Sequence, residues 1–255
     1  MSENNTLIGR AVKHRAFGQG TVTMAAEDTV SVRFPVGEKR FVYPDAFMQY
    51  LSFSDGELQQ TARAQYQAEE ELRQQQYMAK QAEKALRNKL ENFEPLSNSQ
   101  AAFNVPDPEQ VFRVWAVSTG NYLSGASKGK ARRPDKMRPN SACLLTHKAP
   151  SAPESERMIV GAFMVRPDFF GDECEDGVIH AHDEMRIRLS ESAHLPFWPY
   201  FPGETRVKWG ALKYKYFSNM AMQRILQDMA EDAGEDDKLD ILAFRLYHGK
   251  QCGLD

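Results

Sequence analysis

The sequence predicts an α+β protein with a small N-terminal β-barrel, a long polar helix and a larger C-terminal mixed domain. Three observations lead to this prediction. Short alternating segments separated by glycine-containing turns fill residues 1–53, and residues 54–93 lack proline and are rich in Gln, Glu, Ala and Lys. Beyond residue 110, strand-like segments come first and helix-like segments last, an order typical of α+β domains rather than doubly wound sheets.

The N-terminal domain, residues 1–53, is expected to be built from short strands. In residues 30–34, Val30, Val32 and Phe34 alternate with polar residues, which is the period of a strand with one buried face. Tight turns between such strands are typical of a small barrel. Residues 46–51 are expected to form a helical turn that closes one end of it. The expected strands are 11–14, 21–25, 30–34 and 40–43.

The segment 54–93 is expected to be one helix over residues 55–92, because good helix formers dominate it. About 36 helical residues extend roughly 54 Å, which is longer than a small domain is wide. Leu58, Leu72, Ala79 and Leu86 recur at multiples of seven, but polar residues hold the other seam positions. Two alternatives stay open, a solvated spacer helix and a coiled coil that forms a homodimer through residues 55–92.

Prolines and small polar residues over 94–109 predict an interdomain linker, and residues 110–255 are expected to form the second domain. A helix is expected from Ser218 or Asn219 to Gly234, and a last helix is expected to end at Gly249. The expected strands of this domain are 112–117, 141–147, 157–165, 178–181 and 185–189.

Composition limits the function. No apolar run approaches the roughly 20 residues that a membrane span needs, and the first residues lack the pattern of a secretory signal. We therefore expect a cytoplasmic protein without membrane contact. The three cysteines, Cys143, Cys174 and Cys252, form no C-x-x-C pair, which argues against a zinc ribbon or a disulfide framework. We expect no cofactor. Since the net charge is -3, any contact with nucleic acid must come from a local basic patch.

The most basic segment is residues 128–138, which we name the basic loop. Arginines and lysines beside a strand can neutralise phosphates, so these residues are candidates for binding nucleic acid. The alternative is a solvated loop that balances the acidic segments 172–176 and 231–237. The candidate cations are Lys128, Lys130, Arg132, Arg133, Lys136 and Arg138.

Aromatic residues concentrate between Leu195 and Phe217, where they alternate with lysines in a pattern that suits base stacking beside phosphate contacts. A small domain also uses aromatic residues for its core, and we expect most of them to be core. Trp115, Trp198 and Trp209 are the candidates for the wall of a pocket.

Metal chemistry is the third possibility. His180 and His182 lie two residues apart, a spacing that places both imidazoles on one face of a strand beside an acidic segment. No third ligand follows from the spacing, so we expect hydrogen-bonded histidines rather than a metal site.

Residues 12–22 follow the pattern V-x-H-x-x-F-G-x-G-x-V and are followed by the strand Val32-Arg33-Phe34. This part of the chain resembles the SH3/Tudor-like barrel at the C-terminus of some superfamily-one DNA helicases. The resemblance implies contact with protein or nucleic acid. His14 is expected to be packed or hydrogen-bonded rather than a metal ligand.

A second resemblance covers the segment from Trp115 to Val165. Trp115-Ala116-Val117, a long basic loop, residues 137–147 and residues 158–165 follow one another in an order similar to an EVE domain of the PUA-like superfamily. That resemblance implies a pocket for a modified base. Asn140 and Ser141 stand where the family usually has glycine and aspartate.

These observations predict a non-catalytic recognition protein associated with nucleic acid, with DNA as the first candidate and a modified base as its ligand. Two alternatives belong to other classes. One is a protein-interaction adaptor that assembles through the barrel and the helix. The other is a metal-dependent enzyme acting on nucleic acid through His180 and His182.

Overall fold

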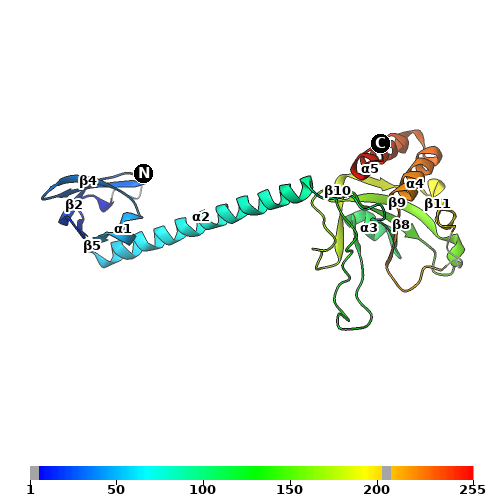
Figure 1. Ribbon diagram of the computed structural model, residues 1–255, viewed down its shortest axis with the longest axis horizontal. Helices are drawn as coiled ribbons and strands as arrows, with labels where there is room; N and C mark the ends of the chain where they lie inside the picture. Colours follow the sequence, from blue (N-terminus) through cyan, green and yellow to red (C-terminus); the bar gives the residue numbers. More distant parts are fainter. Residues whose placement is uncertain (1–5, 203–207, 255) are drawn as a thin grey trace. The chain divides into compact units, whose positions relative to one another are not determined.

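The computed structural model describes residues 6–202 and 208–254. The chain divides into two compact units, Met1–Arg87 and Asn88–Asp255 (Figure 1). None of the helices formed by the described residues combines the length and the apolar character that crossing a bilayer requires.

The first unit contains a five-stranded antiparallel sheet with the order β4-β3-β2-β1-β5. All four strands expected in this region are present. The segment expected to form one helical turn is divided, because its end pairs with β1 as a further strand. The elements are β1 (Ala11–His14), β2 (Gly18–Ala25), β3 (Thr29–Phe34), β4 (Gly37–Val42), α1 (Ala46–Gln49) and β5 (Leu51–Phe53).

The core of the first unit forms on the face of β3 that alternation predicts, with Val30, Val32 and Phe34 buried. The His14 ring stacks on Phe17 with the ring centroids 4.3 Å apart. Its Nδ1 accepts hydrogen bonds from the backbone N–H groups of Ala16, at 3.0 Å, and Phe17, at 3.2 Å. His14 is therefore a hydrogen-bonded core residue, as expected.

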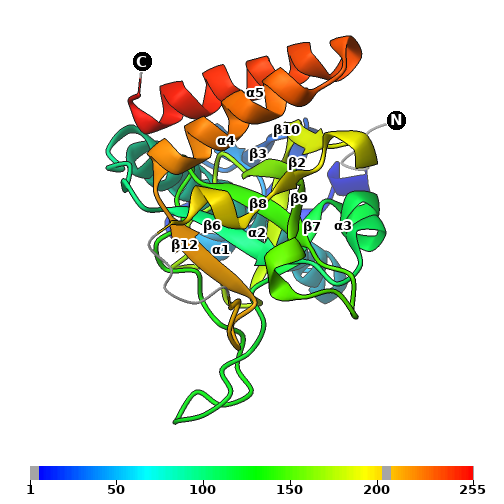
Figure 2. The same cartoon turned by 90° about the vertical axis from the view of Figure 1, so that its right-hand side faces the viewer.

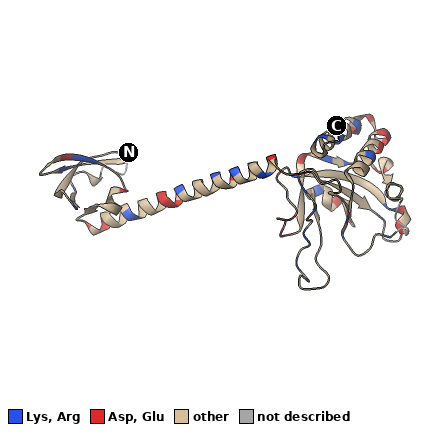
Figure 3. Cartoon of the chain, in the orientation of Figure 1, with Lys and Arg blue, Asp and Glu red and all other residues tan. Residues whose placement is uncertain are grey.

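Helix α2 (Gly56–Glu91) confirms the expected long helix. The Asp55 carboxylate caps its start by accepting from the N–H of Glu57 at 3.0 Å. Ala62 is buried, whereas residues 71–88 are all exposed. Figure 3 shows acidic and basic residues distributed along this helix, and pairs one turn apart such as Glu83 and Arg87, at 3.5 Å, support it locally.

The second unit contains a seven-stranded sheet with the order β12-β6-β8-β9-β10-β7, in which β11 pairs with β9. The sheet curls into a half-barrel. Strand β6 runs parallel to β8, and the other pairs are antiparallel. The strands are β6 (Gln100–Asn104), β7 (Ala116–Ser118), β8 (Ala142–His147), β9 (Met158–Val165), β10 (Val178–Arg188), β11 (Leu195–Pro196) and β12 (Tyr214–Phe217).

Helices α4 (Asn219–Asp232) and α5 (Glu235–Cys252) lie together on one side of this sheet (Figure 2). The Ser218 hydroxyl caps α4 by accepting from the N–H of Ala221 at 3.2 Å, as expected. Apolar residues such as Ile225 and Phe244 fill the space between these helices and the sheet. A second apolar cluster, with Phe163 among its members, lies on the opposite face.

The segment expected to be a linker, 94–109, contains the interior strand β6. Ala101, Ala102 and Phe103 are all buried, because β6 is covered on both faces. A strand buried on both sides shows no alternation of polar and apolar residues, so its short run of small residues resembled a loop.

The prediction of a strand over 112–117 is wrong for residues 112–114, which are helical. Residues Pro108–Val114 form helix α3, capped by the Asp107 carboxylate, which accepts from the N–H of Gln110 at 3.2 Å. Proline in the first helical turn after an aspartate is a helix-start signal. The helix ends at Trp115, which has a φ of 47°, and only then does β7 begin.

Two boundaries change as well. The strands expected at 178–181 and 185–189 are one strand, β10, with an irregularity of register between Ala181 and Arg186. The last helix continues past Gly249 to Cys252 and ends at Gly253, whose φ is 63°. Gly249 has a helical backbone, and the left-handed conformation that ends the helix occurs at Gly253 instead.

Candidate nucleic-acid interface

The basic loop lies in the long connection between β7 and β8, which projects from the sheet in both views (Figures 1 and 2). The two halves of this connection are hydrogen-bonded to each other. The N–H of Tyr122 donates to the carbonyl of Lys130 at 3.0 Å, and the N–H of Arg132 donates to Gly120 at 2.8 Å. Gly125 and Gly129 take positive φ at the tip. The connection is therefore an extended hairpin-like arm that carries its cations away from the sheet.

The root of this arm is fixed to the body of the unit. Met137 is fully buried, and its carbonyl accepts from the N–H of Gly171 at 3.0 Å. A Cβ at position 171 would lie 1.8 Å from the Pro134 carbonyl oxygen, so only glycine allows this approach. These contacts fix the root of the loop, from which Arg133, Lys136 and Arg138 extend, at a defined place on the unit.

Two of the six candidate cations pair with the acidic segment 172–176. Arg133 lies 3.2 Å from the Glu175 carboxylate and also donates to the Asp172 carbonyl. Arg138 lies 3.3 Å from the Asp172 carboxylate and donates to the Asp135 carbonyl at 3.0 Å. Arg133 and Arg138 therefore balance the charge of the acidic segment 172–176, as the alternative interpretation of the basic loop expected.

The other four cations have different surroundings. Lys128 and Lys130 are exposed. The Arg132 guanidinium lies 4.6 Å from the centre of the Tyr122 ring, and the Lys136 ammonium lies 5.3 Å from that of Tyr216. Among the described residues, no carboxylate forms an ion pair with these four side chains. They are the cations best placed to meet phosphates.

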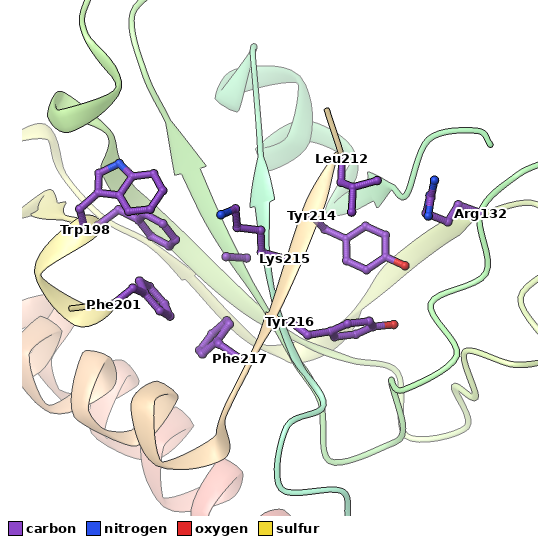
Figure 4. A pocket seen from close by; sticks show the side chains of 10 residues that line it. Arg132, Trp198, Phe201, Leu212, Tyr214, Lys215, Tyr216 and Phe217 are labelled. Carbon is purple, nitrogen blue, oxygen red and sulfur yellow. The ribbon is translucent and has the colours of Figure 1, made fainter. Parts of the chain in front are cut away.

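Beside the root of the arm lies a cavity of about 360 Å³ at the sheet edge formed by β12 (Figure 4). Aromatic rings make most of its wall, and two cationic side chains reach it. The lining residues are Ala102, Arg132, Phe197, Trp198, Phe201, Leu212, Tyr214, Lys215, Tyr216 and Phe217.

Strand β12 divides this cavity, because successive side chains of a strand point to opposite faces. Tyr214 and Tyr216 belong to the apolar cluster on one face of the sheet. Phe217 belongs to the cluster on the other face, together with Trp198 and Phe201. The cavity therefore reaches around the edge of the sheet.

The tyrosines of β12 connect the cavity to the basic loop. The Tyr214 hydroxyl donates to the Arg133 carbonyl at 3.4 Å, and the Tyr216 hydroxyl accepts from the N–H of Lys136 at 3.3 Å. Burial raises the pKa of Tyr214 and of Tyr216, so both stay neutral. These two hydrogen bonds attach the root of the basic loop to the rings of the edge strand.

The three tryptophans expected to wall a pocket do not come together. Trp198 lines the cavity, and its indole N–H donates to the Glu154 carbonyl at 2.6 Å. Trp209 is a core residue of the same cluster that packs on the Arg157 guanidinium at 4.2 Å. Trp115 packs on Phe163 on the opposite face. Trp198 and Trp209 are both buried in one core cluster, and Trp198 alone of the three tryptophans also lines the cavity.

Sequence reasoning treated most rings after Trp198 as core and so missed Phe201, Tyr214, Tyr216 and Phe217 as cavity residues. They are partly core, since Tyr214 is 6% exposed and Phe217 8%. The signal that could have identified them is the alternation of tyrosine with lysine in Lys213-Tyr214-Lys215-Tyr216, which is typical of an edge strand.

The two histidines considered for a metal are placed differently. His182 lies at the irregularity of β10, where its Nδ1 accepts from the N–H of Glu184 at 3.1 Å and its ring packs on Tyr247. His180 borders an acidic groove that also contains Asp176. Within residues 6–202 and 208–254 there is no group of three or more His, Cys, Asp or Glu side chains arranged to hold a metal ion.

Comparison with known proteins adds no relative to this description. No family model matches the chain, and no curated protein and no solved structure matches it.

Proposed function

We propose that this chain is a non-catalytic recognition protein that binds nucleic acid through the basic loop and the aromatic cavity at β12. One observation supports this most strongly. Of the four cations without a carboxylate partner among the described residues, Arg132 lines a cavity walled by aromatic rings and Lys136 packs on Tyr216 of that wall, while Lys128 and Lys130 lie further out on the same loop. Cations next to rings are the combination that sequence-tolerant binding of nucleic acid uses.

The two parts have separate roles. Lysines and arginines position the nucleic acid by neutralising phosphates, while rings stack on bases. Because the net charge of the chain is -3, attraction to a polyanion must be local. No residue of the surface is required to make or break a covalent bond, so the proposal assigns binding rather than catalysis.

The experiment measures binding to labelled DNA and RNA as a function of salt. The variant carrying Lys128→Ala and Lys130→Ala removes two exposed cations. Each phosphate contact contributes about 0.9 to the slope of log affinity against log salt for duplex DNA. We expect the slope to fall by about 1.8 in this variant.

The matched control carries Lys80→Ala and Lys84→Ala on α2, which remove the same charge from exposed positions of the other unit. It should keep the wild-type slope. Absence of any salt-dependent binding by the wild-type protein at low ionic strength would refute the proposal.

We also propose that the two units belong to the families they resemble. An antiparallel five-stranded sheet is compatible with an SH3/Tudor-like barrel, and a curled mixed sheet with terminal helices is compatible with a PUA/EVE-like domain. DNA, with a modified base among its candidates, is the ligand that these resemblances favour, and the cytoplasm is the expected location.

A second candidate function is an adaptor that self-associates through α2. The observation that favours it is the exposure of large apolar side chains on this helix, 54% for Leu72, 63% for Tyr77 and 66% for Met78. Exposed apolar groups of this size gain free energy when a partner covers them. The partner in this proposal is a second copy of the chain.

A further inference from the structure

We infer that the cavity at β12 accepts two neighbouring unpaired bases of a single strand, one on each side of the sheet edge. This inference rests on the proposed function and specifies its ligand. It assigns the rings to two separate stacking sites and the edge of β12 to the phosphate that joins the bases.

The rings fall into two groups in Figure 4. Trp198, Phe201 and Phe217 stand on one side of β12, and Tyr214 and Tyr216 stand on the other, where the side chain of Arg132 approaches them. The strand itself separates the groups. One planar ligand cannot stack on both, whereas two successive bases of a flexible strand can each use one.

The depth of the rings selects unpaired bases. Phe201 and Tyr216 are half-buried and offer ring surface to the cavity, while Trp198, 8% exposed, and Tyr214, 6% exposed, form the wall behind them. A volume of about 360 Å³ is near the lower end of the range for small-molecule sites, roughly 300–1,000 Å³. Bases within a duplex are stacked and cannot enter such a cavity without leaving the stack.

The backbone of β12 offers hydrogen-bonding groups between the two sites. The N–H of Asn104 donates to the Lys213 carbonyl at 2.9 Å, so the residue pair that precedes Tyr214 and Phe103 in the antiparallel register is a hydrogen-bonded one. Because bonded and non-bonded pairs alternate along such a ladder, the N–H and C=O groups of Tyr214 and Tyr216 face away from β6. An N–H at a sheet edge is a donor that suits a phosphate oxygen or a base edge.

Cationic side chains flank that edge on both faces. Lys215 reaches the side of Trp198, with its ammonium 5.3 Å from the centre of that ring. Arg132 and Lys136 reach the side of the tyrosines. A nucleic-acid strand that crosses the edge of β12 therefore meets Lys215 on one face of the sheet and Arg132 and Lys136 on the other.

The test uses the full-length protein and fluorescence anisotropy with labelled thymidine oligonucleotides. One probe is a single strand, one is its duplex with adenosine, and two carry abasic sites everywhere except at one base or at two adjacent bases. We expect the single strand to bind more tightly than the duplex. The probe with two adjacent bases should bind like the complete strand, and the probe with one base should bind more weakly.

Two variants remove one stacking site each and keep apolar volume, Phe201→Leu on one side and Tyr216→Leu on the other. Each should weaken single-strand binding roughly 5- to 150-fold, the range for losing one stacked base, without changing the salt slope. Phe112→Leu is the matched control, because this ring packs on Trp115 away from the cavity. Tryptophan emission and the thermal midpoint verify that all three variants are folded.

The outcomes separate the two proposals. Salt-dependent binding in which the duplex equals the single strand, or in which the two ring variants behave like Phe112→Leu, overturns the two-base inference and leaves the proposed function standing. Equal binding of the one-base and two-base probes overturns it as well. No binding of any probe at low salt refutes the proposed function itself.

Discussion

Replacing Arg157 by alanine should destabilise the second unit strongly. Arg157 does not line the cavity itself, but its partner Glu154 contacts the cavity residue Trp198. This guanidinium is only 2% exposed. It forms a two-pronged contact with the Glu154 carboxylate and packs on Trp209. The Glu154 carbonyl in turn accepts from the indole of Trp198, so the pair anchors one wall of the cavity.

The magnitude follows from what the substitution leaves behind. Arg157 also donates to the Asn104 side chain at 2.9 Å and to the Thr146 hydroxyl at 3.2 Å. Removing one partner of a buried ion pair costs about 3–5 kcal/mol, because the remaining charge keeps its desolvation penalty without compensation. Against a typical total of about 5–15 kcal/mol for a domain, this is a large fraction of the free energy of unfolding.

The assay is urea unfolding followed by tryptophan emission. The three tryptophans all lie in the second unit, so this signal reports on that unit alone. The control is Arg166→Ala, which removes a surface pair with Asp168 whose arginine is 58% exposed and should cost less than about 1 kcal/mol. If Arg157→Ala and Arg166→Ala unfold at the same urea concentration, the buried pair does not have the role assigned to it.

Three further predictions concern other parts of the chain. Burial lowers the pKa of His248 from 6.5 to about 4, so the unfolded chain binds a proton that the folded chain excludes; stability should fall by up to about 3 kcal/mol as the pH drops from 6.5 towards 4, and His248→Gln should remove this dependence in urea titrations. Gly171→Ala forces a Cβ against the Pro134 carbonyl and should lower the free energy of unfolding by about 1–3 kcal/mol or more, while Gly56→Ala, in helix α2 with nothing within 4 Å, should not. Light scattering at high concentration should give twice the chain mass if α2 pairs with a second copy, and Leu72→Lys should return it to the monomer; a monomeric wild-type protein would remove that proposal.

The sequence was sufficient where local rules and the final fold agree. Alternation in β3 predicted its buried face, and Ser218 predicted the start of α4 through its capping hydroxyl. The long helix followed from composition alone, since helix formers without proline persist over its whole length. In each case the deciding interaction lies within a few residues, so no knowledge of distant pairing was needed.

Local rules failed where a distant partner decides. Strand β6 has no alternation because β8 and β12 flank it and both its faces are covered. Helix α3 contains apolar residues that also fit a strand, and the choice was decided by Asp107 and Pro108 at its start. A proline cluster read as a linker therefore concealed both a buried strand and a helix cap.

The residues of the candidate site could not be assigned from local sequence either. Tyr214 and Lys215 are adjacent in sequence, yet one lies in each face of the sheet, and only the pairing of β12 with β6 determines which ring joins which cluster. A dense run of rings and lysines is compatible with a core, a stacking surface or both. The position of β12 at the edge of the sheet distinguishes these cases. A ring on an interior strand has a neighbouring strand on both sides, whereas a ring on an edge strand has one on one side only. The cavity at this place is therefore a property of strand order, which the composition of the segment does not contain.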